Sequence, residues 1–121
     1  MRSTWIEHKG KKILYQDFSE LFFNYDAVKE ELEEVQKVVL EQPAGSLLVL
    51  SNFTDTTIAG DLMGILNESS RITKDHINKT AVLGVTGIKR RLADMLTKLT
   101  GQALKYFDDE YSAKEWLVQD E

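Results

Sequence analysis

Along the chain, short apolar runs alternate with stretches in which apolar residues recur at helical spacing. The clearest case spans residues 80–101, TAVLGVTGIKRRLADMLTKLTG. Residues 80–85 carry no charge, which is typical of a strand covered on both faces in a parallel sheet. A glycine-containing turn follows, and one helical face then holds Ile88, Leu92, Met95, Leu96 and Leu99. This pattern predicts a buried strand, a tight turn and an amphipathic helix that ends at Gly101.

The same pattern predicts five strands and four helices over the whole chain. The strands are expected at residues 4–8, 12–18, 46–51, 80–85 and 104–107. The helices are expected to begin at Asp26, after Thr57, after Thr86 and after Asp108 or Asp109, with residues 68–78 as a polar connection. Gly10 suits a hairpin turn, and strands that alternate with helices favour parallel crossovers. The predicted fold is α/β, in the order β-β-α-β-α-β-α-β-α, with a mixed, mostly parallel five-stranded sheet and an antiparallel edge strand.

Length and composition narrow the class of protein. The 121 residues are expected to form one domain, residues 1–121. A formal charge of −5 argues against nucleic-acid binding, and the absence of cysteine excludes disulfides and thiolate metal sites. No apolar run approaches the roughly 20 residues of a membrane span, and the first residues lack the apolar core of a signal peptide. We therefore expect a cytoplasmic protein without a membrane span.

Residues 17–26 form a loop that is rich in large apolar side chains: Phe18, Leu21, Phe22, Phe23 and Tyr25. One interpretation is that these side chains cap one end of the core. The other is an exposed apolar patch, made of Phe18, Phe22, Phe23 and Phe53, that receives a protein partner or an apolar, lipid-like ligand.

The next segment carries an apolar stripe of Val28, Leu32, Val35, Val38 and Val39. Its acidic residues are expected on the opposite, solvated face: Glu30, Glu31, Glu33 and Glu34. Nothing pairs with these carboxylates at metal-ligand spacing, so no metal site is expected.

Polar residues gather where the parallel strands are predicted to end. Ligands of open α/β sheets bind outside the carboxyl ends of the strands, and a helix N-terminus there presents free N–H groups to an anion. The residues expected at such a ligand site are Asn52, Thr54, Thr86, Gly87, Lys89 and Arg90.

This edge lacks a convincing catalytic set. His8 and His76 have no evident serine or carboxylate partner, so a catalytic triad is not expected. The glycines of GVTGIKRR fit neither the phosphate-binding loop nor the dinucleotide fingerprint. Adjacent Asp108 and Asp109 are interpreted as helix-capping residues. We therefore expect no enzyme, no cofactor and no catalytic residue.

Several segments together resemble the SpoIIAA-like family, which is related to the STAS domain (sulphate transporter and anti-sigma factor antagonist) and is often labelled STAS/SEC14. They are Trp5-Ile6-Glu7, residues 11–17, Ser46-Leu47-Leu48, residues 82–89, Phe107-Asp108-Asp109 and residues 113–117. The resemblance covers nearly the whole chain and implies a small α/β domain with a mixed sheet. Most members of this branch have no assigned biochemical role, so it implies little about function.

The resemblance also implies a phosphorylation site. Anti-sigma antagonists carry a serine that a partner kinase phosphorylates, in an Asp-Ser-Ser-Gly motif before a helix. The corresponding stretch here is Asp55-Thr56-Thr57-Ile58, in which Thr56 is the counterpart of that serine. Threonine replaces serine and Ile58 replaces the glycine. The alternative is that Thr56 or Thr57 caps the helix.

Three functional hypotheses follow. The first is a non-enzymatic regulatory or interaction module of STAS type that docks a protein partner or a second copy of itself. The second is a binder of a small anionic or apolar, lipid-like ligand at the strand ends. The third is an unrecognised enzyme that uses the same cleft.

Overall fold

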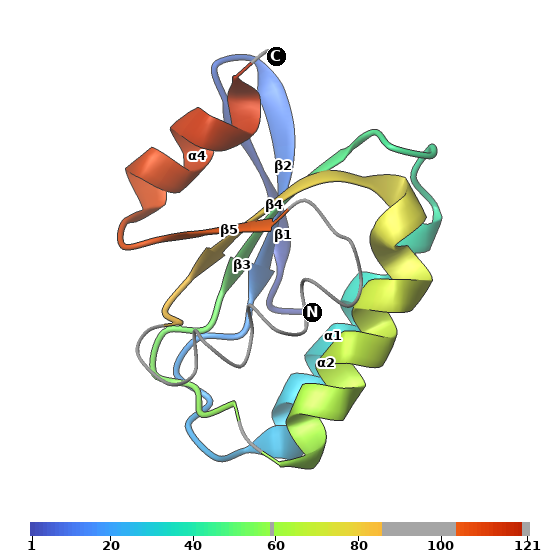
Figure 1. The fold of residues 1–121 in the computed structure, drawn as a ribbon, viewed down its shortest axis with the longest axis vertical. Helices are drawn as coiled ribbons and strands as arrows, with labels where there is room; N and C mark the ends of the chain where they lie inside the picture. Colours follow the sequence, from blue (N-terminus) through green and yellow to red (C-terminus); the bar gives the residue numbers. More distant parts are fainter. Residues whose placement is uncertain (59, 86–103, 120–121) are drawn as a thin grey trace.

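Five strands form one sheet in the order in which they occur along the chain, β1-β2-β3-β4-β5. The computed structural model describes residues 1–58, 60–85 and 104–119 (Figure 1). Its strands are β1 Thr4–His8, β2 Lys11–Asp17, β3 Leu47–Asn52, β4 Ile77–Leu83 and β5 Leu104–Phe107. β1 is antiparallel to β2, and all other neighbours are parallel. The prediction of a mixed, mostly parallel sheet with an antiparallel edge strand is confirmed.

Helices cover both faces of this sheet. They are α1 Tyr25–Leu40, α2 Asp61–Thr73 and α4 Glu110–Val118, with one 3₁₀ turn, η1, at Lys74–His76. α1 and α2 lie side by side on one face, and α4 covers the other (Figure 1). Because side chains alternate along a strand, Leu48 and Leu50 of β3 pack with α4, whereas Val49 packs with α1. The central strand is therefore apolar on both sides, as its sequence predicts.

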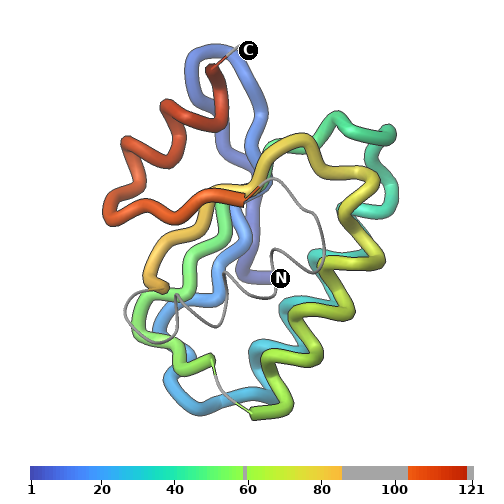
Figure 2. The backbone as a smooth tube through the Cα atoms, viewed as in Figure 1, coloured from blue at the N-terminus to red at the C-terminus, as the bar shows by residue number. Residues whose placement is uncertain are grey.

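The chain path brings the first hairpin and the last helix together. The β1–β2 turn lies beside α4, as the tube in Figure 2 shows. The ammonium group of Lys9 in that turn is 2.8 Å from the Glu115 carboxylate of α4. The hairpin and the last helix are thus fastened to each other at the amino ends of the parallel strands.

The prediction of a polar connection at residues 68–78 is wrong. α2 continues to Thr73, η1 follows, and β4 begins at Ile77 rather than at residue 80. The polar residues are part of the packing: the Ser69 hydroxyl donates to Gln36 Oε1 of α1 at 3.0 Å, and the Thr73 hydroxyl donates to the Ser69 carbonyl at 2.8 Å. Polar composition here reflects hydrogen bonding between helices, not a loop.

α1 is capped two residues earlier than predicted. Asn24 is its N-cap, and the Asn24 side chain accepts a hydrogen bond from the Ala27 N–H at 3.2 Å. Asp26, which was expected to cap the helix, lies in the first turn. A carboxylate there still interacts favourably with the helix dipole.

Glu31 is not part of the solvated face. Its side chain is buried, and its two carboxylate oxygens accept the backbone N–H groups of Arg2 at 2.9 Å and Ser3 at 2.8 Å. Burial raises the pKa of Glu31, but the hydrogen bonds from Ser3 and Arg2 outweigh it and hold that pKa below its ordinary value. Glu31 therefore ties the N-terminal residues to α1. Its spacing, three residues after Val28 and four before Val35, places it on the buried stripe.

A close backbone contact joins the ends of β3 and β4. The Phe53 N–H donates to the Leu83 carbonyl at 2.9 Å, and Gly84 follows with φ of 82°. A Cβ atom on Gly84 would lie 2.3 Å from the Thr54 nitrogen and 2.6 Å from the Phe53 carbonyl carbon. Both neighbours are backbone atoms and cannot rotate away, so only glycine fits this position.

Substitution of Gly84 by alanine tests that contact. We expect Gly84→Ala to lower the free energy of unfolding by about 3 kcal/mol, because the methyl group meets backbone and the left-handed conformation is strained. Urea unfolding followed by circular dichroism gives the value. Gly64→Ala in α2 is the matched control, since a Cβ there meets nothing within 4 Å. It should stabilise the helix by about 0.5–1 kcal/mol. Equal effects of the two substitutions would contradict the contact.

Candidate functional site

Two loops lie against each other at the carboxyl ends of β2 and β3. The Phe18 N–H donates to the carbonyl of Asn52, the last residue of β3, at 3.0 Å. The Glu20 and Phe22 N–H groups donate to the Thr54 and Asp55 carbonyls in the loop after β3, at 2.8 and 2.9 Å. The Thr57 N–H donates back to the Phe22 carbonyl at 2.8 Å. The parallel pairing of the two strands thus continues beyond their ends, and it fixes the backbone of residues 18–24.

This paired loop has an unusual backbone. Glu20, Phe22 and Asp55 all have positive φ, of 56°, 50° and 58°. That conformation is uncommon for residues other than glycine and is unfavourable for an aromatic residue. The hydrogen bonds to the neighbouring loop hold it in place.

The hydroxyl of Thr56 links the same two loops. Thr56 is buried, its hydroxyl donates to the Phe18 carbonyl, and it accepts the Leu21 N–H at 3.0 Å. A kinase has no access to an oxygen in this position, so the geometry argues against the predicted phosphorylation of Thr56. The alternative prediction is wrong, because α2 begins at Asp61 with Gly60 as its N-cap and has no side-chain cap.

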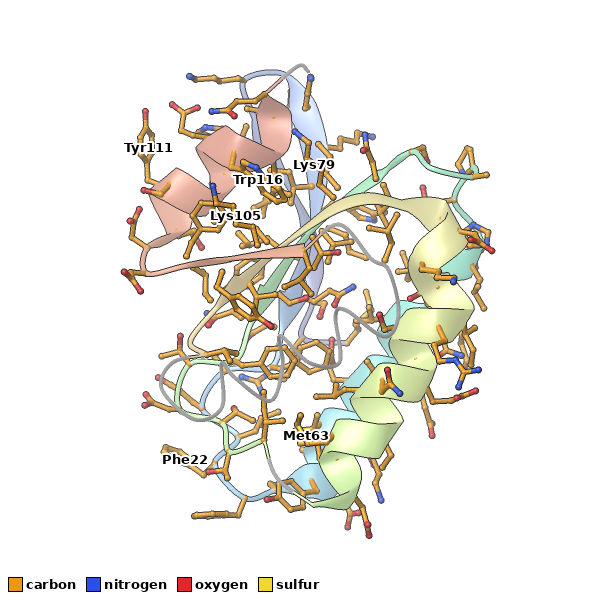
Figure 3. The ribbon with its side chains drawn as sticks, in the orientation of Figure 1. Phe22, Met63, Lys79, Lys105, Tyr111 and Trp116 are labelled. Carbon is orange, nitrogen blue, oxygen red and sulfur yellow. The ribbon has the colours of Figure 1, made fainter. Side chains whose placement is uncertain are left out.

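The four phenylalanines of the predicted apolar patch are divided between the core and the surface. Phe18 and Phe53 are buried and stack on each other, with ring centroids 4.9 Å apart and planes at 11°. Their assignment to an exposed patch is therefore wrong. Phe22 and Phe23 are 58% and 74% exposed, and Figure 3 shows Phe22 at the outer edge of the molecule. We call these two residues the Phe22–Phe23 pair.

The predicted ligand residues are only partly described by the structure. Asn52 and Thr54 lie beside the paired loops, where Asn52 Oδ1 accepts the Thr54 hydroxyl at 2.6 Å and Asn52 Nδ2 donates to the Tyr15 hydroxyl at 2.8 Å. Thr86, Gly87, Lys89 and Arg90 lie outside the described residues. An anion site at this edge therefore stays a prediction.

The capping role predicted for the Asp108-Asp109 pair is confirmed for Asp109. Asp109 caps α4, and its Oδ1 accepts the Ser112 N–H at 2.7 Å. This hydrogen bond and a second one from the Ser112 hydroxyl lower the pKa of Asp109. An ionised capping carboxylate does not exchange protons at neutral pH, so it is a poor acid or base catalyst.

His8 does have a carboxylate partner, contrary to expectation. Its Nε2 lies 3.3 Å from Glu115 Oε2, and Glu115 also accepts the Tyr111 hydroxyl at 2.6 Å. The hydrogen bond from Lys9, followed by that from Tyr111, lowers the pKa of Glu115 to about 2. The cluster is a structural clamp between the β1–β2 turn and α4. The sequence offers no signal for it, because Glu115 is 107 residues from His8.

A mainly apolar cavity of about 150 Å³ lies between the sheet and the α1–α2 layer. Its wall includes Phe18 and Phe53 of the stacked pair, Val82 of β4 and Met63 of α2, which is labelled in Figure 3. Asn67 also lines the cavity, and its Oδ1 is buried without a hydrogen-bond partner in the described part of the chain.

Two features are absent from residues 1–58, 60–85 and 104–119. Within these ranges no helix has the length and apolar character that crossing a bilayer requires. No three acidic or histidine side chains in these ranges gather closely enough to hold a metal ion.

A comparison with solved structures places this fold. The chain is similar to the crystal structure of an uncharacterized protein of the DUF3478 family from Shewanella loihica PV-4, which has a SpoIIAA-like fold. The TM-score is 0.73 at 12% sequence identity, over 96% of this chain and 92% of the other. No family model matches the sequence, and no curated protein matches it. At this identity the likeness shows the fold alone: the chain has the SpoIIAA-like fold that its sequence motifs imply.

The structural role of the Thr56 hydroxyl can be measured. We expect Thr56→Val to lower the free energy of unfolding by about 1–3 kcal/mol, because it leaves the Leu21 N–H without its acceptor. Thr56→Ser should restore most of that loss. Thr57→Val is the control and should cost less than about 0.5 kcal/mol, since no hydrogen bond of its side chain is seen among the described residues. A neutral Thr56→Val variant would show that the hydroxyl does not hold the loops together.

Proposed function

We propose that this protein is a non-enzymatic interaction module of STAS type that docks a partner protein through the Phe22–Phe23 pair. The observation that carries the proposal is the exposure of two adjacent aromatic rings on a hydrogen-bonded backbone. Both exceed half exposure, while the backbone beneath them is hydrogen-bonded on both sides of Phe22.

Exposed aromatic side chains on a fixed backbone suit recognition. An aromatic anchor that is already ordered loses little conformational entropy when a partner covers it. Aromatic residues are enriched among the few positions that dominate binding energy at interfaces. The left-handed backbone at Phe22 has a steric cost, and burial of the ring against a partner offsets it.

The surrounding charges indicate what kind of partner fits. Glu20 and Asp55 in the two loops and Asp26 in the first turn of α1 are exposed and lie near the pair in the sequence or across the loop pairing. An apolar groove with a basic rim complements this surface. A second copy of the same surface would place carboxylates against carboxylates, so we propose a different protein rather than a homodimer.

The test begins with a photo-crosslinking amino acid in place of Phe23 in cells, followed by mass spectrometry of the adduct. The captured protein is then purified and titrated with the wild-type chain. Phe22→Ser should weaken binding by about 30-fold, and binding should also weaken as salt is raised. Ile72→Ser removes an apolar side chain of α2 that is 44% exposed, and it should leave the affinity unchanged.

Three outcomes would count against this proposal. The first is that Phe22→Ser and Ile72→Ser weaken binding equally. The second is that neither substitution changes the affinity. Sedimentation could instead show a wild-type dimer that Phe22→Ser dissociates, which would identify a second copy as the occupant. Thermal unfolding of both variants checks that each remains folded.

The apolar cavity favours a second candidate function, the binding of a small apolar ligand. Its volume of about 150 Å³ accommodates one ring, because apolar protein cavities of that size take up benzene. The unpartnered Asn67 Oδ1 would accept a hydrogen bond, so a ring with one donor group fits better than a bare hydrocarbon.

Binding of phenol and benzene tests this second function. Both should raise the melting temperature, and phenol should bind more tightly because its hydroxyl reaches Asn67. In Asn67→Leu the preference for phenol should disappear while benzene still binds. Ligand binding in this cavity is contradicted if neither compound raises the melting temperature. It is also contradicted if Asn67→Leu still binds phenol more tightly than benzene. Asn78→Leu, outside this cavity, serves as the control.

A further inference from the structure

A second, polar pocket lies at the opposite end of the sheet from the Phe22–Phe23 pair. It has a volume of about 510 Å³ and opens at the amino ends of β2, β3 and β4, below the C-terminus of α4. Its polar lining is Lys11, Lys12, Ser46, Asn78, Lys79 and Gln119, and we call it the lysine pocket. No acidic side chain is among its described lining residues. In a chain with a formal charge of −5, such a gathering of lysines is unusual.

Lys79 is the buried member of this pocket. It is 6% exposed, and its ammonium group donates to the Trp116 and Gln119 carbonyls at 3.1 and 2.9 Å. The same group lies 5.3 Å from the centre of the Trp116 ring, and Figure 3 shows the two side chains together. In residues 1–58, 60–85 and 104–119 this ammonium forms no ion pair with a carboxylate. Two of its three N–H groups have oxygen acceptors there, which leaves one to donate to a ligand.

Capping of α4 accounts for only part of this charge. The C-terminus of a helix carries about half a negative charge, which the Lys79 ammonium alone compensates. Lys11 donates to the Val118 carbonyl at 3.0 Å at the same helix end, and Lys12 adds a further charge at the rim. Among the described residues, the lysine pocket therefore holds more positive charge than the helix end requires.

We propose that the lysine pocket binds the phosphate group of a small phosphorylated molecule. Lysine ammonium groups act as point charges toward phosphate, and the side-chain amides of Asn78 and Gln119 provide neutral donors beside them. The pocket is larger than an inorganic ion, so it has room for the organic part of a phosphate ester. The site is separate from the proposed docking surface and does not depend on it.

Amide chemical shifts test the proposal directly. The ¹⁵N-labelled chain is titrated with inorganic phosphate, glycerol 3-phosphate and, as a control at matched ionic strength, sodium chloride. We expect saturable shifts at Lys12, Asn78 and Lys79 with either phosphate compound and none with chloride. Tighter binding of the ester indicates an organic phosphate, and equal binding indicates that the phosphate group alone is recognised. Shifts scattered over the surface, or equal shifts with chloride, would overturn the proposal.

Variants make the assignment specific to this pocket. Lys79→Met should weaken binding at least tenfold and Lys12→Gln about fivefold, whereas Lys29→Gln, at an exposed lysine of α1, should have no effect. If Lys79→Met does not fold, the comparison of Lys12→Gln with Lys29→Gln tests the site, because Lys12 is exposed. Equal losses in Lys12→Gln and Lys29→Gln would overturn the site. Asp120 and Glu121 follow Gln119 in the sequence, so binding seen only in the Asp120→Asn/Glu121→Gln variant would overturn it too.

Discussion

The contact between Gly84 and the Phe53–Thr54 backbone is the constraint on which the carboxyl end of this sheet depends. It brings the exits of β3 and β4 so close that no side chain fits between them. The loop after β3 is therefore fixed, and it becomes a template for the loop after β2 through parallel hydrogen bonds. Phe18 and Phe53 stack inward as a result, while Phe22 and Phe23 are left outside. The exposed aromatic pair is thus a consequence of backbone packing two strands away.

The sheet could be predicted from the sequence because its signal is local. Uninterrupted apolar runs identify covered parallel strands, and the runs at Leu47 and Thr80 lie where β3 and β4 are observed. The errors concern polar residues whose partners are distant. Glu31 binds backbone groups 28 and 29 residues away, and Ser69 binds a side chain 33 residues away. A polar residue at a buried helical position was read as surface or loop, because its hydrogen-bond partner is invisible in the sequence.

The candidate site was predicted less well than the fold, for a related reason. Four phenylalanines were assigned to one patch, but a loop has no period that would separate inward from outward rings. What separates them is a left-handed residue, Phe22, which turns its side chain away from the core. The same pairing of loops buries Thr56, although its sequence context suggested a surface site. Lys79 lies between the predicted connection and the predicted strand, which starts at residue 80, whereas β4 begins at Ile77 and includes Lys79.

The two ends of the sheet differ in chemistry, and this has a consequence for how they can act. The carboxyl end presents aromatic rings among carboxylates, and the amino end presents lysines. Asp17 and Lys11 are the opposite ends of one strand, β2, which is hydrogen-bonded on both sides. Binding at one end affects the other only if a strand shifts, since coupling needs an element with two arrangements. The Gly84 contact opposes such a shift because it leaves no free space between β3 and β4. The geometry therefore favours independent binding at the two proposed sites over a switch that connects them.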